Sequence, residues 1–240
     1  MRLGIDGRSG ESSQTTRRCV ALPVALAAAA LVVLSIPRTM GVIVSFQAEP
    51  TLRKLQDQQP VQIADLATLA DAQKAGSFWL GDGRVRTDLG LAYLLLAEML
   101  PRDDPQADRY LTQAVDALKS GLAREPANPY AWARLAYAEA LAAEGWSAPA
   151  VAALRLALVT APYEPRLLWS RLRMSFLAWP QMSSEDRELV FRQIRYAWLA
   201  NPAELTRLAL ELKQVNLVRA ALLRQPEDIR TFEELLKTPQ

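Results

Sequence analysis

Apolar residues recur at helical spacing along most of the chain. In residues 61–75, VQIADLATLADAQKA, the side chains Ile63, Leu66 and Leu69 fall three residues apart, which is the spacing of one face of an α-helix. Gly76 follows as the residue expected to end this helix. Beyond residue 84 no alternation typical of strands appears, while Ala, Leu, Arg and Glu dominate. The pattern predicts an all-α fold.

A repeated helix becomes visible when four segments are aligned on the prolines that follow them. The prolines are Pro126, Pro162, Pro202 and Pro226. Eight residues before each proline the side chain is bulky and apolar: Leu118, Leu154, Ile194 and Val218. Five residues before each proline it is small: Gly121, Ala157, Ala197 and Ala221. With further bulky residues at eleven and four before, these offsets share one helical face, so they predict a buried face with a close helix approach at the small residue.

The spacing of the repeat predicts a stack of helix pairs. The prolines recur after 36, 40 and 24 residues, which suits pairs stacked into a solenoid. The last interval is short, so we expect a degenerate fourth unit, with residues 227–236 closing the end of the stack. The expected body is therefore an α-solenoid of about three helix pairs plus a capping C-terminal segment.

Several of these residues resemble the tetratricopeptide repeat. Leu89, Gly90 and Tyr93 match the Leu-Gly-x-x-Tyr pattern of its first helix, within the apolar stretch TDLGLAYLLLAEML. The residues that match the second helix as small, bulky, small and proline are Ala114, Leu118, Gly121 and Pro126. The next unit repeats both patterns with Trp132, Leu135, Ala136, Ala150, Leu154, Ala157 and Pro162. The resemblance covers residues 84–226, about 60% of the chain, although the loops PRDDPQAD and WPQMSSED are irregular.

An apolar run near the N-terminus predicts one transmembrane helix. Residues 19–37, CVALPVALAAAALVVLSIP, approach the roughly 20 residues that a helix needs to cross a bilayer. The alternatives are a cleaved signal peptide, against which the absence of a good cleavage site counts, and a twin-arginine signal built on Arg17 and Arg18. Slightly more basic residues precede the run than follow it, which favours a cytoplasmic N-terminus and an exported body.

This division gives four segments. They are a disordered tail at 1–16, a transmembrane anchor at 17–47, a tether with a leading helix at 48–83, and the helical-repeat domain at 84–240. We expect a single-pass protein of the bacterial inner membrane with the repeat domain on the periplasmic side.

The composition argues against an enzyme. The chain has no histidine, which removes the usual neutral-pH general base and the usual metal ligand, and its one cysteine, Cys19, cannot form a thiolate cluster. Its acidic pairs, such as Asp103 with Asp104, are sequence neighbours that do not face each other on a helix. With 28 basic and 26 acidic residues no strong field for nucleic acid exists. We therefore predict no catalytic residues, no cofactor, no metal and no nucleic-acid partner.

The resemblance implies a partner-binding groove lined by the first helix of each repeat. The positions that correspond to such a groove are Leu91, Leu94, Leu95, Tyr130, Tyr137, Leu141, Leu167, Met174 and Leu177. They predict an unusually apolar groove, suited to an amphipathic helix or apolar peptide, and the charged clamps that hold a partner's carboxyl terminus in some members of the family are missing from these positions. The alternative is that these residues are core, covered by residues 61–80 or by the C-terminal helix.

A column of basic residues accompanies the repeat. Seven residues before each proline stand Lys119, Arg155, Arg195 and Arg219, which would form a basic stripe for anionic lipid, an acidic partner or an acidic glycan. The alternative is a solvated outer face with pairs inside each helix. The third unit contains two tryptophans and two arginines, which either stack sugars and bind acids or, as tryptophans that fill gaps between helices and arginines that cover them, have a structural role: Trp169, Arg171, Arg173 and Trp179.

A narrower resemblance concerns residues 126–182. The segment PANPYAWARLAYAEALA and the tryptophan-containing helix after it are similar to small membrane-anchored accessory proteins of bacterial exopolysaccharide synthesis and export. The expected function is a membrane-anchored scaffold that binds a protein or peptide near the bilayer. The alternative is a permanent structural subunit of an envelope complex without an open groove, and self-association is left open.

Overall fold

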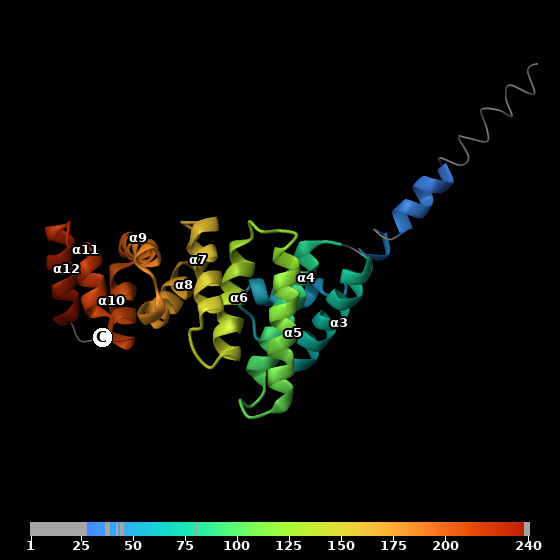
Figure 1. Cartoon of the computed structure of the whole chain (residues 1–240), viewed down its shortest axis with the longest axis horizontal. Helices are drawn as coiled ribbons and strands as arrows, with labels where there is room; N and C mark the ends of the chain where they lie inside the picture. The colour runs from blue at the N-terminus through green and yellow to red at the C-terminus, as the bar shows by residue number, and fades with distance from the viewer. Residues whose placement is uncertain (1–27, 37–38, 42, 44–45, 80, 238–240) are drawn as a thin grey trace, which may run out of the picture.

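The fold is all-α over the residues that the structure describes. The computed structural model describes residues 28–36, 39–41, 43, 46–79 and 81–237, and this part of the chain contains helices and no strand (Figure 1). The predicted fold class is confirmed at this level. The predicted tail at 1–16 lies outside the described residues.

Two helices lie between the helix of residues 28–36 and the helix pairs that form most of the body. Helix α2 spans Glu49–Gln56 and α3 spans Ile63–Trp79. The prediction of a tether at this point was incomplete, because Leu52 and Leu55 of α2 pack against a buried cluster that includes Leu66 of α3. The sequence predicted that Gly76 ends this helix. In the structure α3 continues to Trp79, and Gly76 is buried inside it.

Four helix pairs and a closing helix follow. The first helices of the pairs are α4 (Gly83–Met99), α6 (Pro129–Ala142), α8 (Pro165–Ala178) and α10 (Pro202–Glu211). The second helices are α5 (Pro105–Leu122), α7 (Ala148–Thr160), α9 (Ser184–Ala200) and α11 (Val215–Leu222); a 3₁₀ turn, η1 (Trp179–Gln181), follows α8, and α12 (Pro226–Lys237) ends the body. The expectation that the fourth unit is too short for a pair was wrong, since α10 and α11 form one with ten and eight residues.

Local chemistry marks where the helices begin. At seven helix starts the side chain before the first turn accepts a hydrogen bond from a backbone N–H two or three residues later, which satisfies a donor that has no partner within the helix. These residues are Asp82, Asp104, Asn128, Ser147, Glu164, Ser183 and Asn201. Five of these helices also carry proline in the first turn, where its missing N–H costs nothing.

The repeated positions of the second helices form the core. The four bulky side chains eight residues before the prolines, Leu118, Leu154, Ile194 and Val218, have 0% exposure. The small residues three positions later are buried too. At Gly121 a Cβ atom would lie 2.8 Å from the backbone oxygen of Gly83, so α4 and α5 approach closely there. The predicted buried face is confirmed in all four second helices, and the close approach is seen at Gly121.

The helices stand in a row (Figure 1). Each helix contacts its sequence neighbour, α4 also contacts α6, α6 contacts α8, and α12 covers α10 and α11. The helix of residues 28–36 projects from the α3 end, opposite to the C-terminus (Figure 1). Among the described residues no helix is long and apolar enough to cross a bilayer. The predicted span, residues 19–37, lies partly outside them, and its described part is helical.

Candidate partner-binding groove

Five of the nine predicted groove residues line one pocket. Its volume is about 340 Å³, and it extends over the first helices of three successive pairs. Leu94 comes from α4, Tyr130 and Tyr137 from α6, and Leu167 and Met174 from α8. The remaining lining residues are Ala133, Arg134, Ser170 and Arg173. The structure thus brings together side chains that lie up to 80 positions apart, since 174 − 94 = 80.

The floor of the pocket is apolar and its rim is polar. Leu94 and Met174 are 3% and 8% exposed, whereas Tyr137 is 36% exposed. On α6 the lining residues follow the spacing of one helical face, because Tyr130, Ala133 and Tyr137 are three and four residues apart. A floor of this kind accepts an apolar group, and the rim offers hydrogen bonds to its surroundings.

The other four predicted groove residues lie elsewhere. Leu95 packs against the cluster shared by α2, α3 and α4, and Leu141 packs against the main core. Leu95 and Leu141 therefore pack with the core, as the alternative interpretation of the groove residues expected. Leu91 is half-buried and does not line the pocket. Leu177 is 50% exposed and also lies outside it.

Tyr137 is fixed at the rim by a hydrogen bond. Its hydroxyl donates to Glu98 Oε1 of α4 over 2.7 Å. Partial burial, together with the carboxylate of Glu98, raises the pKa of Tyr137 to about 12. The phenol is therefore neutral at physiological pH, and it joins α4 to α6 beside the pocket.

Two arginines, Arg134 and Arg173, line the pocket beside the predicted apolar positions. Arg134 Nη1 lies 3.5 Å from Asp88 Oδ1, and Arg173 makes a two-pronged contact with Glu211 that includes a 2.9 Å bond. Burial raises the pKa of Asp88 although Arg134 is close, while Arg173 lowers the pKa of Glu211. Both arginines are neutralised by partners, so the pocket carries little net charge. Arg134 lies four residues after Tyr130, so helical spacing could have predicted that both side chains line the groove.

The basic column does not form a stripe of free charge. Lys119 Nζ lies 2.6 Å from Glu139, Arg155 Nη2 lies 3.1 Å from Glu185, and Arg219 Nε lies 2.7 Å from Glu233. The fourth residue, Arg195, lines a surface pocket that also contains Glu188. The partners lie on neighbouring helices, not on the same helix as the alternative supposed. Such exposed pairs contribute little stability, and they neutralise three of the four residues in the column.

Arg171 of α8 has a structural role. Its side chain is 0% exposed, and Nη1 donates to the backbone oxygens of Ala157 and Ala161 over 2.8 and 2.7 Å. Nη2 donates to Gln193 Oε1 over 3.2 Å, and Gln193 donates to the oxygen of Pro162 over 2.6 Å. One cation thus holds the carboxyl end of α7 against α8 and α9, where the helix dipole favours positive charge.

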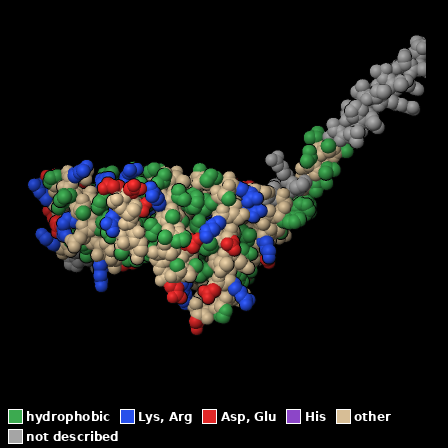
Figure 2. Space-filling view, in the orientation of Figure 1, with side chains coloured by type: hydrophobic (Ala, Val, Ile, Leu, Met, Phe, Trp, Pro, Cys, Tyr) green, Lys and Arg blue, Asp and Glu red, His purple; other side chains and the backbone are tan. Residues whose placement is uncertain are grey.

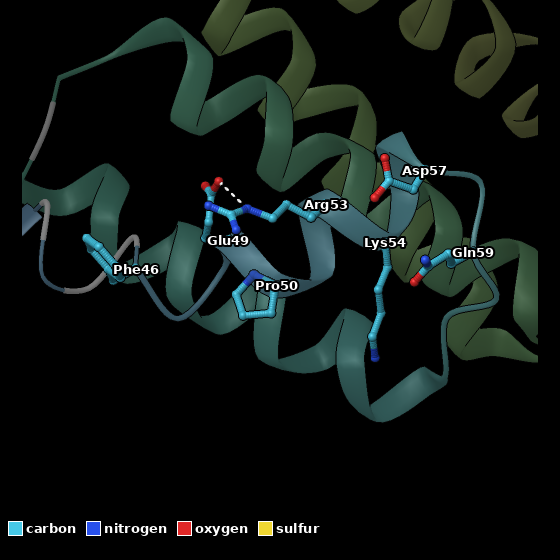
Figure 3. Close-up of a pocket in the computed structure, with 7 residues that line it drawn as sticks. All are labelled: Phe46, Glu49, Pro50, Arg53, Lys54, Asp57 and Gln59. Atoms are coloured by element: carbon cyan, nitrogen blue, oxygen red, sulfur yellow. Dashed lines mark hydrogen bonds and ion pairs between the residues drawn. The ribbon is translucent and has the colours of Figure 1, made fainter.

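A second depression adjoins α2 (Figure 3). It has a volume of about 380 Å³ and is lined by Phe46, Glu49, Pro50, Arg53, Lys54, Asp57 and Gln59. Arg53 points toward Glu49, to which its Nε donates over 3.1 Å, while Lys54 points away from both (Figure 3). The charged side chains do not converge, so the depression is not organised to hold an anion or a metal ion. In the described part of the chain no group of three acidic, cysteine or histidine side chains is placed to bind a metal.

Comparison with protein-family models, with curated proteins and with solved structures gives no match. The fold and the pocket define the class of this protein as an all-α protein built from successive helix pairs. Its function is argued from the pocket itself.

Proposed function

We propose that this chain is a binding protein whose helix pairs form a tetratricopeptide-like stack and whose pocket over α4, α6 and α8 holds an apolar side chain of a partner protein or peptide. The observation that supports this most is the composition of the pocket. An apolar floor formed by Leu94 and Met174 lies under a rim of tyrosines, and this is the form of an anchor site in which one side chain is desolvated.

The pocket also indicates what kind of anchor it takes. Its volume of about 340 Å³ is near the lower end of the range for ligand sites, which suits one or two large side chains. Arg134 and Arg173 already have carboxylate partners, so an acidic anchor would have to displace Asp88 or Glu211. A neutral aliphatic or aromatic side chain, presented on a helix or extended segment, fits these conditions.

Membrane anchoring is part of the proposal. Residues 19–37 would hold the body at the bacterial inner membrane, with the helical domain exported. Confinement to that surface raises the effective concentration of the pocket toward other membrane residents without any new contact. The pathway that we propose, on the resemblance of residues 126–182, is the synthesis or export of exopolysaccharide, with this chain as an accessory scaffold.

Photocrosslinking in native membranes tests the pocket. A benzophenone amino acid at Tyr137 in the full-length chain should capture a discrete partner, whereas the same group at the exposed Ala152 of α7 should not. Ser170 is exposed at the rim, so Ser170→Trp should fill the pocket without removing core. We expect it to reduce crosslinking at least about tenfold, or about 1.4 kcal/mol, with unchanged helical circular dichroism.

The matched control for this variant is Ala152→Trp, which adds the same bulk on α7 outside the pocket. Crosslinking at position 137 that is unaffected by Ser170→Trp would contradict the proposal. Recovery of the chain itself as the sole product would favour self-association instead.

A permanent structural subunit is the second candidate, and a separate observation favours it. Three residues before the repeated prolines, Val159, Leu199 and Leu223 are 50%, 81% and 70% exposed. Exposed apolar side chains at equivalent places suggest a long contact with another subunit. In that case Leu199→Glu, not Ser170→Trp, should release the protein from its complex on native gels.

A further inference from the structure

Two aromatic side chains lie exposed at the end of α3. Phe78 is 82% exposed and Trp79 is 38% exposed, and their rings meet edge to face with centroids 5.3 Å apart. The described chain leaves most of Phe78 and more than a third of Trp79 uncovered. Exposed aromatic side chains favour binding to a partner, because binding buries a large apolar area that would otherwise contact water.

The surroundings of this pair are apolar and continue toward the projecting helix. The segment that carries Phe46, itself 74% exposed, lies beside the end of α3 in both views (Figures 1 and 3). The exposed apolar side chains are Leu31, Val32, Val33, Leu34 and Ile36 on the projecting helix, and Met40 and Ile43 between it and this segment. Figure 2 shows these apolar side chains along the helix of residues 28–36 and at its junction with the body. An apolar helix and an aromatic cluster therefore adjoin at one end of the molecule.

Charge does not select the partner at this end. The two cations of α2 are matched by carboxylates, Arg53 by Glu49 and Lys54 by Asp65 at 3.0 Å. An acidic protein would gain little here. Tryptophan and phenylalanine beside an apolar helix are typical of the boundary between a bilayer and water, where an apolar ring is buried and the indole N–H stays wet.

We propose that Phe46, Phe78 and Trp79 form a lipid-contacting surface, the α3 foot, that inserts into the interfacial layer of the bilayer. The occupant is the glycerol and upper acyl region of phospholipid. The foot fixes the orientation of the body relative to the membrane, since an anchor helix alone would leave the body free to rotate. This inference rests on the proposed anchoring and adds a second, independent contact to it.

Site-specific fluorescence in lipid nanodiscs tests the foot with matched exposures. In the full-length chain the single cysteine is removed by Cys19→Ser, and a polarity-sensitive dye is attached after Phe78→Cys, Leu199→Cys or Leu34→Cys. Phe78 and Leu199 are about equally exposed, at 82% and 81%. Phe78 lies at the foot, whereas Leu199 lies on α9, toward the C-terminal end of the row. Leu34, 71% exposed, reports on the anchor. The discs contain phosphatidylcholine and phosphatidylglycerol, with lipids that carry a doxyl quencher near the headgroup, and one protein copy each.

We expect blue-shifted emission and doxyl quenching at positions 34 and 78, with quenching at 78 severalfold stronger than at 199. Quenching at 34 with water-like emission at 78 would overturn the foot and leave the anchor standing. Blue-shifted emission at 78 without doxyl quenching would indicate a protein contact, and would overturn it too. Quenching at all three positions would mean that the body lies flat on the lipid, which also contradicts the proposal.

A second variant tests whether the aromatic residues act together. With the dye at Phe46→Cys, the substitutions Phe78→Ser and Trp79→Ser should reduce doxyl quenching at position 46, because the foot would lose most of its apolar area. Leu199→Ser serves as the control and should leave quenching unchanged. An equal signal in both variants would exclude a shared surface. Crosslinking at Tyr137 measures the proposed groove separately, so failure of the foot and failure of the groove are distinguishable.

Discussion

Charged residues at equivalent positions of the first helices have different roles. Asp88, Arg134 and Arg171 each precede the leucine that matches between the first helices, Leu89, Leu135 and Leu172. Asp88 and Arg134 pair with each other across α4 and α6 beside the pocket. Arg171 instead turns to the end of α7, where backbone oxygens accept its hydrogen bonds. The sequence predicted a cover for tryptophan at this position, because helical spacing alone does not show where the preceding helix ends.

Replacement of Arg171 should destabilise the protein more than any exposed arginine. Arg171→Met removes the donors of three hydrogen bonds and leaves buried acceptors without partners, so we expect a loss of about 2–4 kcal/mol in the free energy of unfolding. Arg166→Met, on the exposed face of the same helix, should change it by less than about 0.5 kcal/mol. Urea titration followed by circular dichroism measures both. Equal effects would show that the buried network contributes nothing specific.

Tyr137 makes stability depend on alkaline pH. Its pKa is raised from 10.0 to about 12, which means that the folded state holds the phenolic proton more tightly than the unfolded chain does. The contribution of this proton is complete below pH 10 and is lost as the pH rises through about 12. Relative to Tyr137→Phe, the wild type should therefore lose unfolding free energy between those values. The difference between the two proteins, measured by urea unfolding at several pH values, isolates Tyr137 from the other tyrosines. A constant difference would contradict the hydrogen bond to Glu98.

At the scale of elements, the close contact between α4 and α5 depends on Gly121. A Cβ atom there would lie 2.5 Å from Thr87 Cγ2 and 2.8 Å from the oxygen of Gly83, and a backbone atom cannot move aside without shifting the helix. We expect Gly121→Ala to cost about 1–3 kcal/mol by overpacking, although alanine is the better helix former by about 1 kcal/mol. Gly81→Ala is the control, because a Cβ atom at that position meets nothing within 4 Å. Thermal unfolding measures the two, and stabilisation by Gly121→Ala would show that the helices can separate freely.

The same scale shows what sequence reasoning finds and what it misses. The second helices were predicted with their buried columns, because four aligned segments average out local variation and leave the period of the buried face. Helix α2 was missed because eight residues with only Leu52 and Leu55 as anchors give no period to detect. The pair α10 and α11 was discounted for its length, whereas contact with α12 supplies the burial that short helices lack. In the pocket, the apolar residues were predictable from helical spacing. Helical spacing could not show that Arg134 and Arg173 are neutralised, since their partners Asp88 and Glu211 lie on other helices.

At the scale of the whole molecule, a row of helices makes stability local. Each helix contacts near neighbours in sequence, so a defect at one end should not reach the other. Phe232 of α12 is 0% exposed and meets the ring of Trp198 edge to face, with centroids 6.1 Å apart. Phe232→Ala should cost about 3–5 kcal/mol, and that loss should appear as faster hydrogen exchange in α10, α11 and α12 and at the Trp198 end of α9, but not in the helices before α9.

The control for this experiment is Leu223→Ala, since Leu223 is 70% exposed and its loss should leave exchange unchanged. Protection that falls equally from α4 to α12 in the Phe232→Ala variant would mean that the body unfolds as one cooperative unit. Mass spectrometry of peptides from each helix distinguishes the two results.

The position of Arg171 has a mechanical consequence. It lies at the junction between the second and third helix pairs, in the middle of a row whose ends are the projecting helix of residues 28–36 and α12 (Figure 1). Tension applied between those ends must pass through this junction. A guanidinium that holds α7, α8 and α9 together resists bending there, so under load these three helices should move as one stiff block while the row flexes at its other joints first.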